Sequence, residues 1–191
     1  MPQNLAAWQQ KKILRAEIKK LREILPQQEV KDRSNKILSN LWQISTFNQT
    51  KSVFCYISFR NEVDTFPVIK QLLAKQITVA VPKMVDKMMI PVEIKSVDNL
   101  IKSKFSTLEP VSSVVLKQPL SLCLTPGIAF SKDGGRLGWG GGYYDAYFEQ
   151  NPDIIKIGLA YNFQVVDHVP VDEKDQKIDI IVTEDEVIRC P

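Results

Sequence analysis

The sequence predicts an α/β domain with a largely parallel β-sheet. Helix-compatible segments alternate along the chain with short apolar runs of the kind found in buried strands. Polar residues, glycine or proline bound these runs, and there are no internal repeats or low-complexity tracts. A chain of 191 residues is long enough for one substantial core. We therefore expect a single domain over residues 1–191.

The N-terminal part predicts two helices. Apolar residues recur at helical spacing up to Leu25, so a helix is expected over about Asn4–Leu25 and should end at Pro26. A second helix is expected over about Gln28–Ser45. The polar face of the first helix is basic and carries Lys11, Lys12, Arg15, Lys19, Lys20 and Arg22. Most of these cations are expected to be solvated, whereas Lys11 and Arg15 lie one turn apart on one face.

Five apolar runs predict the buried strands, and they are Ser52–Ser58, Ile77–Val81, Leu120–Leu124, Ile154–Tyr161 and Ile178–Thr183. A helix beginning at Thr65 separates the first two. Weaker strands are expected at Met88–Ile94 and Ser106–Leu108, and Pro91 favours an edge position for the former.

Two polar residues follow predicted strands. Glu62 comes soon after the first strand, where ligands bind in open α/β sheets. From its position alone, however, a solvated loop carboxylate is the better interpretation. Lys83 follows the second strand, and its sequence position is equally consistent with a place near the site or away from it.

Seven of the eight glycines fall between Gly127 and Gly142, which indicates a local structural demand. We expect the order strand, glycine loop, helix, which presents backbone N–H groups to an anion beside the charge of Arg136. No GxxxxGK[ST] motif occurs, and Tyr143 stands where a dinucleotide fingerprint needs glycine. Taken alone, the loop could be an anion cradle or a plain surface loop.

Composition and residue counts exclude several kinds of site. His168 is the only histidine and the three cysteines form no CxxC pair, which argues against a zinc cluster. There is no GxSxG nucleophile motif. Carboxylates remain as ligands for Mg²⁺, and Asp145 beside the glycine loop suits that role. Asp179 stands at a strand start and could be structural.

The overall balance of residues is that of an ordinary globular protein, with 44 % hydrophobic residues, 25 % charged residues and a net charge of +3. This mild charge does not favour nucleic-acid binding. No signal peptide and no apolar stretch of about 18 residues is recognised, so we expect no membrane partner. Cysteine usage is consistent with a reduced, cytoplasmic protein.

The segment PGIAFSKDGGRLGWGGGYYDAY resembles the P-G-x-x-F-D-x-x-G-x-R-L-G-x-G-x-G-Y-Y-D signature of the 5-formyltetrahydrofolate cyclo-ligase family. Further family-like pieces are KKILRAEIK, YISFRNEVDT, VAVPK, GLAYNFQ and VPVDEKDQKID, in the family's order. Several ordered motifs make the resemblance specific and extend it over nearly the whole chain.

The resemblance implies a three-layer fold similar to the ribose-phosphate isomerase and CoA-transferase-like proteins. It also implies a monomeric ligase that converts 5-formyltetrahydrofolate to 5,10-methenyltetrahydrofolate and turns ATP into ADP and phosphate. The implied partners are therefore small molecules, a folate and ATP, with Mg²⁺ as the metal.

Site residues are carried over from the matching motifs. The implied catalytic residues are Lys11, Arg15 and Arg136, which would also contact ATP. The other implied ATP-binding residues are Leu137, Gly138, Trp139, Gly140, Gly141, Gly142, Tyr143 and Tyr144. The implied folate-binding residues are Ile57, Glu62, Trp139, Gly140, Gly141, Gly142 and Tyr143. The implied metal ligands are Asp145 and Asp175, whereas Asp172 is expected to be solvated.

Two departures from the family pattern matter. Trp139 and Gly141 stand where some relatives carry basic residues, so the phosphate charge should rest on Lys11, Arg15 and Arg136. Ser131 stands where the signature has aspartate, with Asp133 nearby.

Two rival interpretations come from other classes of protein. A folate- or nucleotide-binding protein without turnover would have a broken loop or lack Lys11, Arg15 or Asp145, and all three are present. A nucleic-acid-binding module would interleave basic and aromatic residues, which the first helix does not do.

Overall fold

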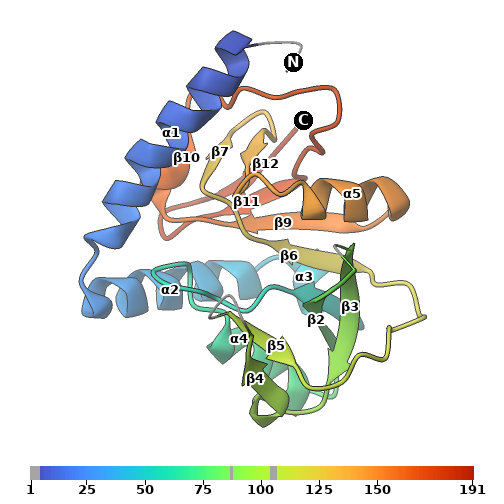
Figure 1. Ribbon diagram of the computed structural model, residues 1–191. Coiled ribbons are helices and arrows are strands. Elements are labelled where there is room, and N and C mark those ends of the chain that lie inside the picture. The colour runs from blue at the N-terminus through green and yellow to red at the C-terminus, as the bar shows by residue number, and fades with distance from the viewer. Residues whose placement is uncertain (1–4, 87, 104–106) are drawn as a thin grey trace.

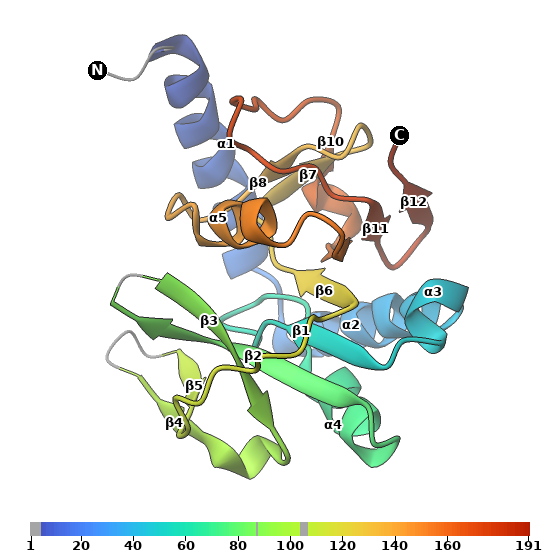
Figure 2. The same ribbon diagram turned by 90° about the vertical axis from the view of Figure 1, so that its right-hand side faces the viewer.

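A seven-stranded sheet forms the centre of the computed structural model, which describes residues 5–86, 88–103 and 107–191 (Figures 1 and 2). The strand order is β12-β11-β9-β6-β1-β2-β3, and the five inner strands pair in parallel. The outer strands β3 and β12 pair antiparallel to their neighbours. The strands are β1 (Ser52–Cys55), β2 (Thr78–Val85), β3 (Met88–Ile94), β6 (Leu122–Thr125), β9 (Ile155–Leu159), β11 (Ile180–Val182) and β12 (Val187–Arg189). The predicted parallel sheet and the edge position of the strand with Pro91 are confirmed.

Helices cover both faces of this sheet. On one face lie α2 (Gln27–Trp42), α3 (Ser45–Asn48) and α4 (Phe66–Ala74), and on the other lies α5 (Tyr143–Gln150). Strand β1 shows the alternation that this requires, because Val53 joins the cluster with α2 and α4 whereas Phe54 packs with Phe148 of α5. The sheet and its two helical layers confirm the predicted three-layer α/β fold.

A second, smaller sheet lies beside α1 (Leu5–Glu23) and has the order β10-β7-β8 (Figure 1). Its strands are β7 (Ala129–Ser131), β8 (Arg136–Leu137) and β10 (Val165–Val166). Ile18 of α1 packs against Ile128, Leu137 and Val169 in this region. The first helix is therefore held against the segment that leads into the glycine loop.

This small sheet corrects one prediction. The glycine loop was expected to follow the strand Leu120–Leu124 directly, but the antiparallel pair β7 and β8 stands between them. The two strands have three and two residues, which is too short for a recognisable alternation of apolar and polar residues. The tight turn that joins them uses Gly134 at φ +90°.

The remaining elements connect or extend the two sheets. Strands β4 (Leu100–Lys102) and β5 (Leu108–Pro110) form a hairpin, and η1 (Val97–Asn99) and η2 (Asn162–Gln164) are short 3₁₀ helices. Of the predicted strand Ser106–Leu108, residue 106 lies outside the described residues. The expected helix over Gln28–Ser45 is divided into α2 and α3. Among the described residues, no helix has the length and apolar character needed to cross a membrane.

Candidate active site

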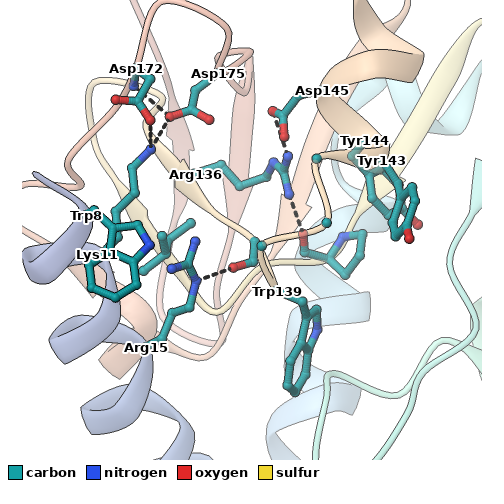
Figure 3. A pocket seen from close by; sticks show the side chains of 16 residues that line it. Trp8, Lys11, Arg15, Arg136, Trp139, Tyr143, Tyr144, Asp145, Asp172 and Asp175 are labelled. Carbon is teal, nitrogen blue, oxygen red and sulfur yellow. Dashed lines mark hydrogen bonds and ion pairs between the residues drawn. The ribbon is translucent and has the colours of Figure 1, made fainter. Parts of the chain in front are cut away.

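A cavity of about 430 Å³ lies between α1, the glycine loop and the segment before β11 (Figure 3). Every residue expected to contact ATP lines it, namely Lys11, Arg15, Arg136, Leu137, Gly138, Trp139, Gly140, Gly141, Gly142, Tyr143 and Tyr144. The two expected metal ligands, Asp145 and Asp175, line it as well. The fold thus gathers residues that are more than 160 positions apart in the sequence, such as Lys11 and Asp175.

The glycine loop owes its shape to three of its glycines. Gly140 and Gly142 have φ angles of +103° and +67°, which residues other than glycine rarely adopt. At Gly138 the constraint is space, because a Cβ atom there would lie 2.8 Å from Nη1 of Arg136. The carbonyl of Gly142 accepts the first helical hydrogen bond of α5, from the N–H of Ala146 at 3.0 Å. The loop therefore delivers the N-terminus of α5 to the cavity.

Arg136 is a buried cation of the cavity, with only 7 % of its surface exposed. Its Nη2 donates to Oδ1 of Asp145 at 2.8 Å and its Nη1 donates to the carbonyl of Pro126 at 3.5 Å. The same Asp145 oxygen accepts the N–H of Gln176 at 3.1 Å. Nε of Arg136 is buried and has no hydrogen-bond partner among the described residues. The guanidinium is thus fixed in position while one of its donors remains unused.

Lys11 adds a second cation from α1. Its Nζ donates to Oδ2 of Asp172 and to Oδ2 of Asp175, both at 2.7 Å. Burial alone would lower the pKa of Lys11, but these two hydrogen bonds outweigh it and raise the pKa. Asp172 was expected to be solvated, and its side chain is indeed 59 % exposed, but it also forms an ion pair with Lys11. The sequence signal for this shared pairing is the spacing of three residues between Asp172 and Asp175, because a turn joins the two residues.

Arg15 adds the third cation and also ties α1 to the loop. Its Nε donates to the carbonyl oxygen of Gly138 at 2.9 Å, and burial lowers its pKa. Trp8, one turn before Lys11 on α1, lines the same cavity and was not recognised in the sequence. Its spacing of three residues from Lys11 could have indicated it.

Glu62 lies deeper, outside this cavity, with 7 % of its surface exposed. Its Oε2 accepts the N–H of Phe59 at 3.0 Å, and its Oε1 accepts Nε1–H of Trp139 at 3.2 Å. Nη1 of Arg22 lies 3.8 Å from Oε1. Burial raises the pKa of Glu62, and the charge of Arg22 and the two hydrogen bonds oppose that rise. The solvated state favoured by position alone is therefore wrong for Glu62, and the solvated state expected for Arg22 is wrong too.

Other candidate residues have structural surroundings. Ile57 belongs to the main hydrophobic cluster, so its contact with folate stays a prediction. Lys83 donates to three backbone carbonyls, including that of Pro110, and does not line the cavity. Asp179 accepts the backbone N–H of Lys156 at 2.6 Å, as a structural residue would.

The departure at Ser131 has a simple explanation in the structure. The hydroxyl of Ser131 is buried and donates to Oδ1 of Asp133 in the turn before β8. This hydrogen bond lowers the pKa of Asp133, whose Oδ1 also accepts the N–H of Gly135. A carboxylate is thus present at this turn although it comes from a neighbouring position.

Comparison with known proteins gives a consistent result. The sequence profile of the 5-formyltetrahydrofolate cyclo-ligase family matches residues 7–184. A probable 5-formyltetrahydrofolate cyclo-ligase of Caenorhabditis elegans is 31 % identical, over 80 % of both chains. The mouse 5-formyltetrahydrofolate cyclo-ligase is 28 % identical, over 92 % of this chain and 94 % of its own.

Two solved structures share the fold. The 5,10-methenyltetrahydrofolate synthetase of Aquifex aeolicus superposes with a TM-score of 0.83 at 32 % identity, covering 94 % of this chain and 92 % of its own. The 5,10-methenyltetrahydrofolate synthetase of Mycoplasma pneumoniae gives a TM-score of 0.70 at 27 % identity, covering 91 % of this chain and 98 % of its own. Both superpositions therefore extend over nearly the whole chain.

Proposed function

We propose the following chemistry from the premise that the chain belongs to the 5-formyltetrahydrofolate cyclo-ligase family. The chain is a ligase that converts 5-formyltetrahydrofolate to 5,10-methenyltetrahydrofolate, and ATP is converted to ADP and phosphate in the reaction. The observation that supports this site most strongly is the gathering of Lys11, Arg15 and Arg136 around one cavity beside a glycine loop.

The reaction needs an activated formyl group, because the formyl oxygen is a poor leaving group. The formyl oxygen attacks the γ-phosphorus of ATP, and ADP departs with the electrons of the broken P–O bond. The N10 amine then attacks the activated formyl carbon, the C–O bond breaks, phosphate leaves with the formyl oxygen, and N10 loses its proton. No covalent bond to the protein is needed at any step.

The protein's part is to position the phosphates and neutralise their charge. Arg136 is held in position by hydrogen bonds to Asp145 and Pro126, so its guanidinium needs little reorganisation when an anion binds. Lys11 and Arg15 reach the cavity from α1 on the opposite wall (Figure 3). Backbone N–H groups at the start of α5 would add further donors to the phosphates.

Two carboxylates fit a Mg²⁺ ion at this cavity. The bonds described above engage Oδ1 of Asp145 and Oδ2 of Asp175, so the other oxygen of each is available as a ligand. Among the described residues, no group of three or more His, Cys, Asp or Glu surrounds a common metal position. Mg²⁺ usually takes only one or two carboxylates and completes its shell with phosphates and water. Bound there, it would neutralise phosphate charge.

The folate would lie on the far side of Trp139 from the nucleotide cavity. Glu62 would accept N–H hydrogen bonds from the pterin, and Trp139 and Tyr143, whose side chains are both about 44 % exposed, would offer aromatic faces to it. Trp139 is suited to this boundary because it lines the nucleotide cavity and contacts Glu62.

The activity is tested by mixing the protein with 5-formyltetrahydrofolate, ATP and Mg²⁺ and recording the near-ultraviolet absorbance of the methenyl product. We expect product only when ATP is present. Folded protein that forms no product above a protein-free control would refute the proposal. We also propose that the protein is cytoplasmic and monomeric, and sedimentation of the purified protein tests the monomeric state.

A further inference from the structure

Arg22 is the most deeply buried cation of α1. It lies in the last turn of the helix and has only 3 % of its surface exposed, whereas Lys12, Lys19 and Lys20 are largely or partly exposed. A buried guanidinium is costly unless it is paired, because it has left water. The contacts of Arg22 should therefore show what the fold gains from placing it there.

Arg22 contacts two side chains that belong to the folate side of the proposed site. Its Nη1 lies 3.8 Å from Oε1 of Glu62, and its guanidinium carbon lies 5.1 Å from the ring of Trp139. Nε1 of Trp139 donates to the same Glu62 oxygen at 3.2 Å. Three segments, α1, the loop after β1 and the glycine loop, thus meet at one carboxylate oxygen.

Hydrogen bonds from Asn61 to the backbone also link the two segments that carry Arg22 and Glu62. The side-chain amide of Asn61, next to Glu62, donates to the carbonyl of Arg22 at 2.9 Å and to that of Leu25 at 3.2 Å. These hydrogen bonds tie the end of α1 to the segment that carries Glu62. The narrow gap that Arg22 and Glu62 line together has no room for a water molecule, whereas Arg22 also borders a cavity of about 310 Å³ and Glu62 one of about 560 Å³.

The charge of Arg22 acts on Glu62 in a setting with few competitors. Burial raises the pKa of Glu62, and Arg22 is the charged side chain that opposes the rise. Tyr56 and Tyr144 face the same region, but burial raises the pKa of each well above its usual value, so both stay neutral. Glu62 itself borders a wider cavity, whose other charged residues are Lys31, Arg60 and Asp64, and Lys19 and Glu23 line a further cavity together with Arg22.

We propose that Arg22 is a positioning residue for the folate: it keeps the Glu62 carboxylate ionised and aimed, and it supports the Trp139 ring that covers that carboxylate. The inference rests on the proposed role of Glu62 as acceptor for the pterin N–H groups. Arg22 itself makes no contact with the reacting atoms. It acts through Glu62, because a neutral carboxylic acid would face the pterin donors with only one good acceptor.

A purely structural role for Arg22 predicts something different. If Arg22 only ties α1 to the domain, its loss lowers the melting temperature and weakens folate and ATP use alike. A positioning role separates the two ligands and changes how folate use depends on pH. The sign follows from the charges: without Arg22 the pKa of Glu62 rises further, so the carboxylate becomes ionised only at higher pH.

The test compares the parent enzyme with Arg22→Met and Arg22→Gln, which remove the charge, and with Arg22→Lys, which keeps it. Lys19→Met is the matched control, because Lys19 lies 4.9 Å from the same Trp139 ring and is not paired with Glu62. At neutral pH we expect Arg22→Met to lose roughly tenfold to a hundredfold in kcat/KM for the folate. The KM for ATP should change less than about twofold, since the charge acts on the folate side.

The pH profile decides the question. In Arg22→Met and Arg22→Gln the KM for folate should fall to its plateau at a higher pH than in the parent, whereas Arg22→Lys and Lys19→Met should keep the parent profile. An unshifted profile in either uncharged variant overturns the inference. So does an Arg22→Lys variant with the same folate loss as Arg22→Met. If Arg22→Met does not fold, Arg22→Gln gives the result.

A measurement without any ligand separates this inference from the proposed activity. With Trp8 and Trp42 replaced by phenylalanine, emission reports Trp139, whose indole N–H donates to Glu62. Its pH titration should have its midpoint at higher pH when Arg22 is replaced by Met. An unchanged midpoint overturns the role of Arg22 even in an active enzyme, whereas absence of methenyl product in the parent would refute only the activity.

Discussion

The close approach of Gly138 to Arg136 gives a prediction about the glycine loop. In Gly138→Ala the new Cβ would lie 2.8 Å from Nη1 of Arg136, while ordinary contacts begin at 3.4 Å. The guanidinium must therefore retreat by about 0.6 Å in a closely packed site. Because Nη2 is bonded to Asp145 at 2.8 Å, the retreat disturbs the buried ion pair that fixes Arg136 at the cavity.

The expected loss follows from the contact that is disturbed. A hydrogen bond to a charged group contributes about 1.5–3 kcal/mol, so Gly138→Ala should lose roughly tenfold to a hundredfold in kcat/KM for ATP. Arg136→Ala should fall in the same range. The backbone of Gly138 is not in the positive-φ region, so alanine adds no conformational strain of that kind.

A double-mutant cycle tests the reasoning, because the clash requires both partners. In the Arg136→Ala background, Gly138→Ala should cause no further loss, as the atom it would meet is gone. Gly142→Ala is the control: its Cβ would meet nothing within 4 Å, and its positive φ costs about 1–2 kcal/mol in any background. Gly142→Ala should therefore be additive with Arg136→Ala. Steady-state kinetics with varied ATP measure all of these, and additive losses for Gly138→Ala would refute the clash.

Three further predictions concern Glu62, Asp145 and two cysteines. The Glu62→Gln side chain can accept only one of the two N–H groups that now bond to the carboxylate. The KM for folate should therefore rise roughly fivefold to more than a hundredfold. The exposed Glu149→Gln is the control, and an equal rise in that variant would contradict the assignment of Glu62. Asp145→Asn should raise the Mg²⁺ concentration needed for half-maximal rate, and an unchanged requirement would remove Asp145 from the metal site. Burial raises the pKa of Cys123 to about 12 and that of Cys190 to about 11, so iodoacetamide at pH 8 should label neither in the folded protein; labelling at the rate of the unfolded chain would contradict this.

The parts of the fold that sequence predicts well have a strong local signal. The buried strands appear as apolar runs because both faces of a parallel strand are covered. Pro91 marks the edge strand because it lacks a donor for a second neighbour. The clustering of glycines identifies the loop, since Gly140 and Gly142 need positive φ angles.

The parts that sequence does not predict depend on distant partners. On α1, Arg22 looks like its neighbouring cations, and its burial depends on Glu62, which lies forty positions away. Asp172 is exposed as expected, but its ion pair with Lys11 joins residues 161 positions apart, so no local pattern predicts it. The strands β7 and β8 are too short for a periodic pattern, and their apolar residues Ala129 and Leu137 pack with Ile18 of α1, which is distant in the sequence.

The central claim is that the cavity lined by Lys11, Arg15 and Arg136 activates the formyl oxygen by phosphorylation. It is tested most directly by labelling that oxygen with ¹⁸O in 5-formyltetrahydrofolate and analysing the phosphate released in one round of turnover by mass spectrometry. The account predicts one ¹⁸O atom in each phosphate formed together with a methenyl product. Unlabelled phosphate, formed at the same rate as the methenyl product, would contradict it.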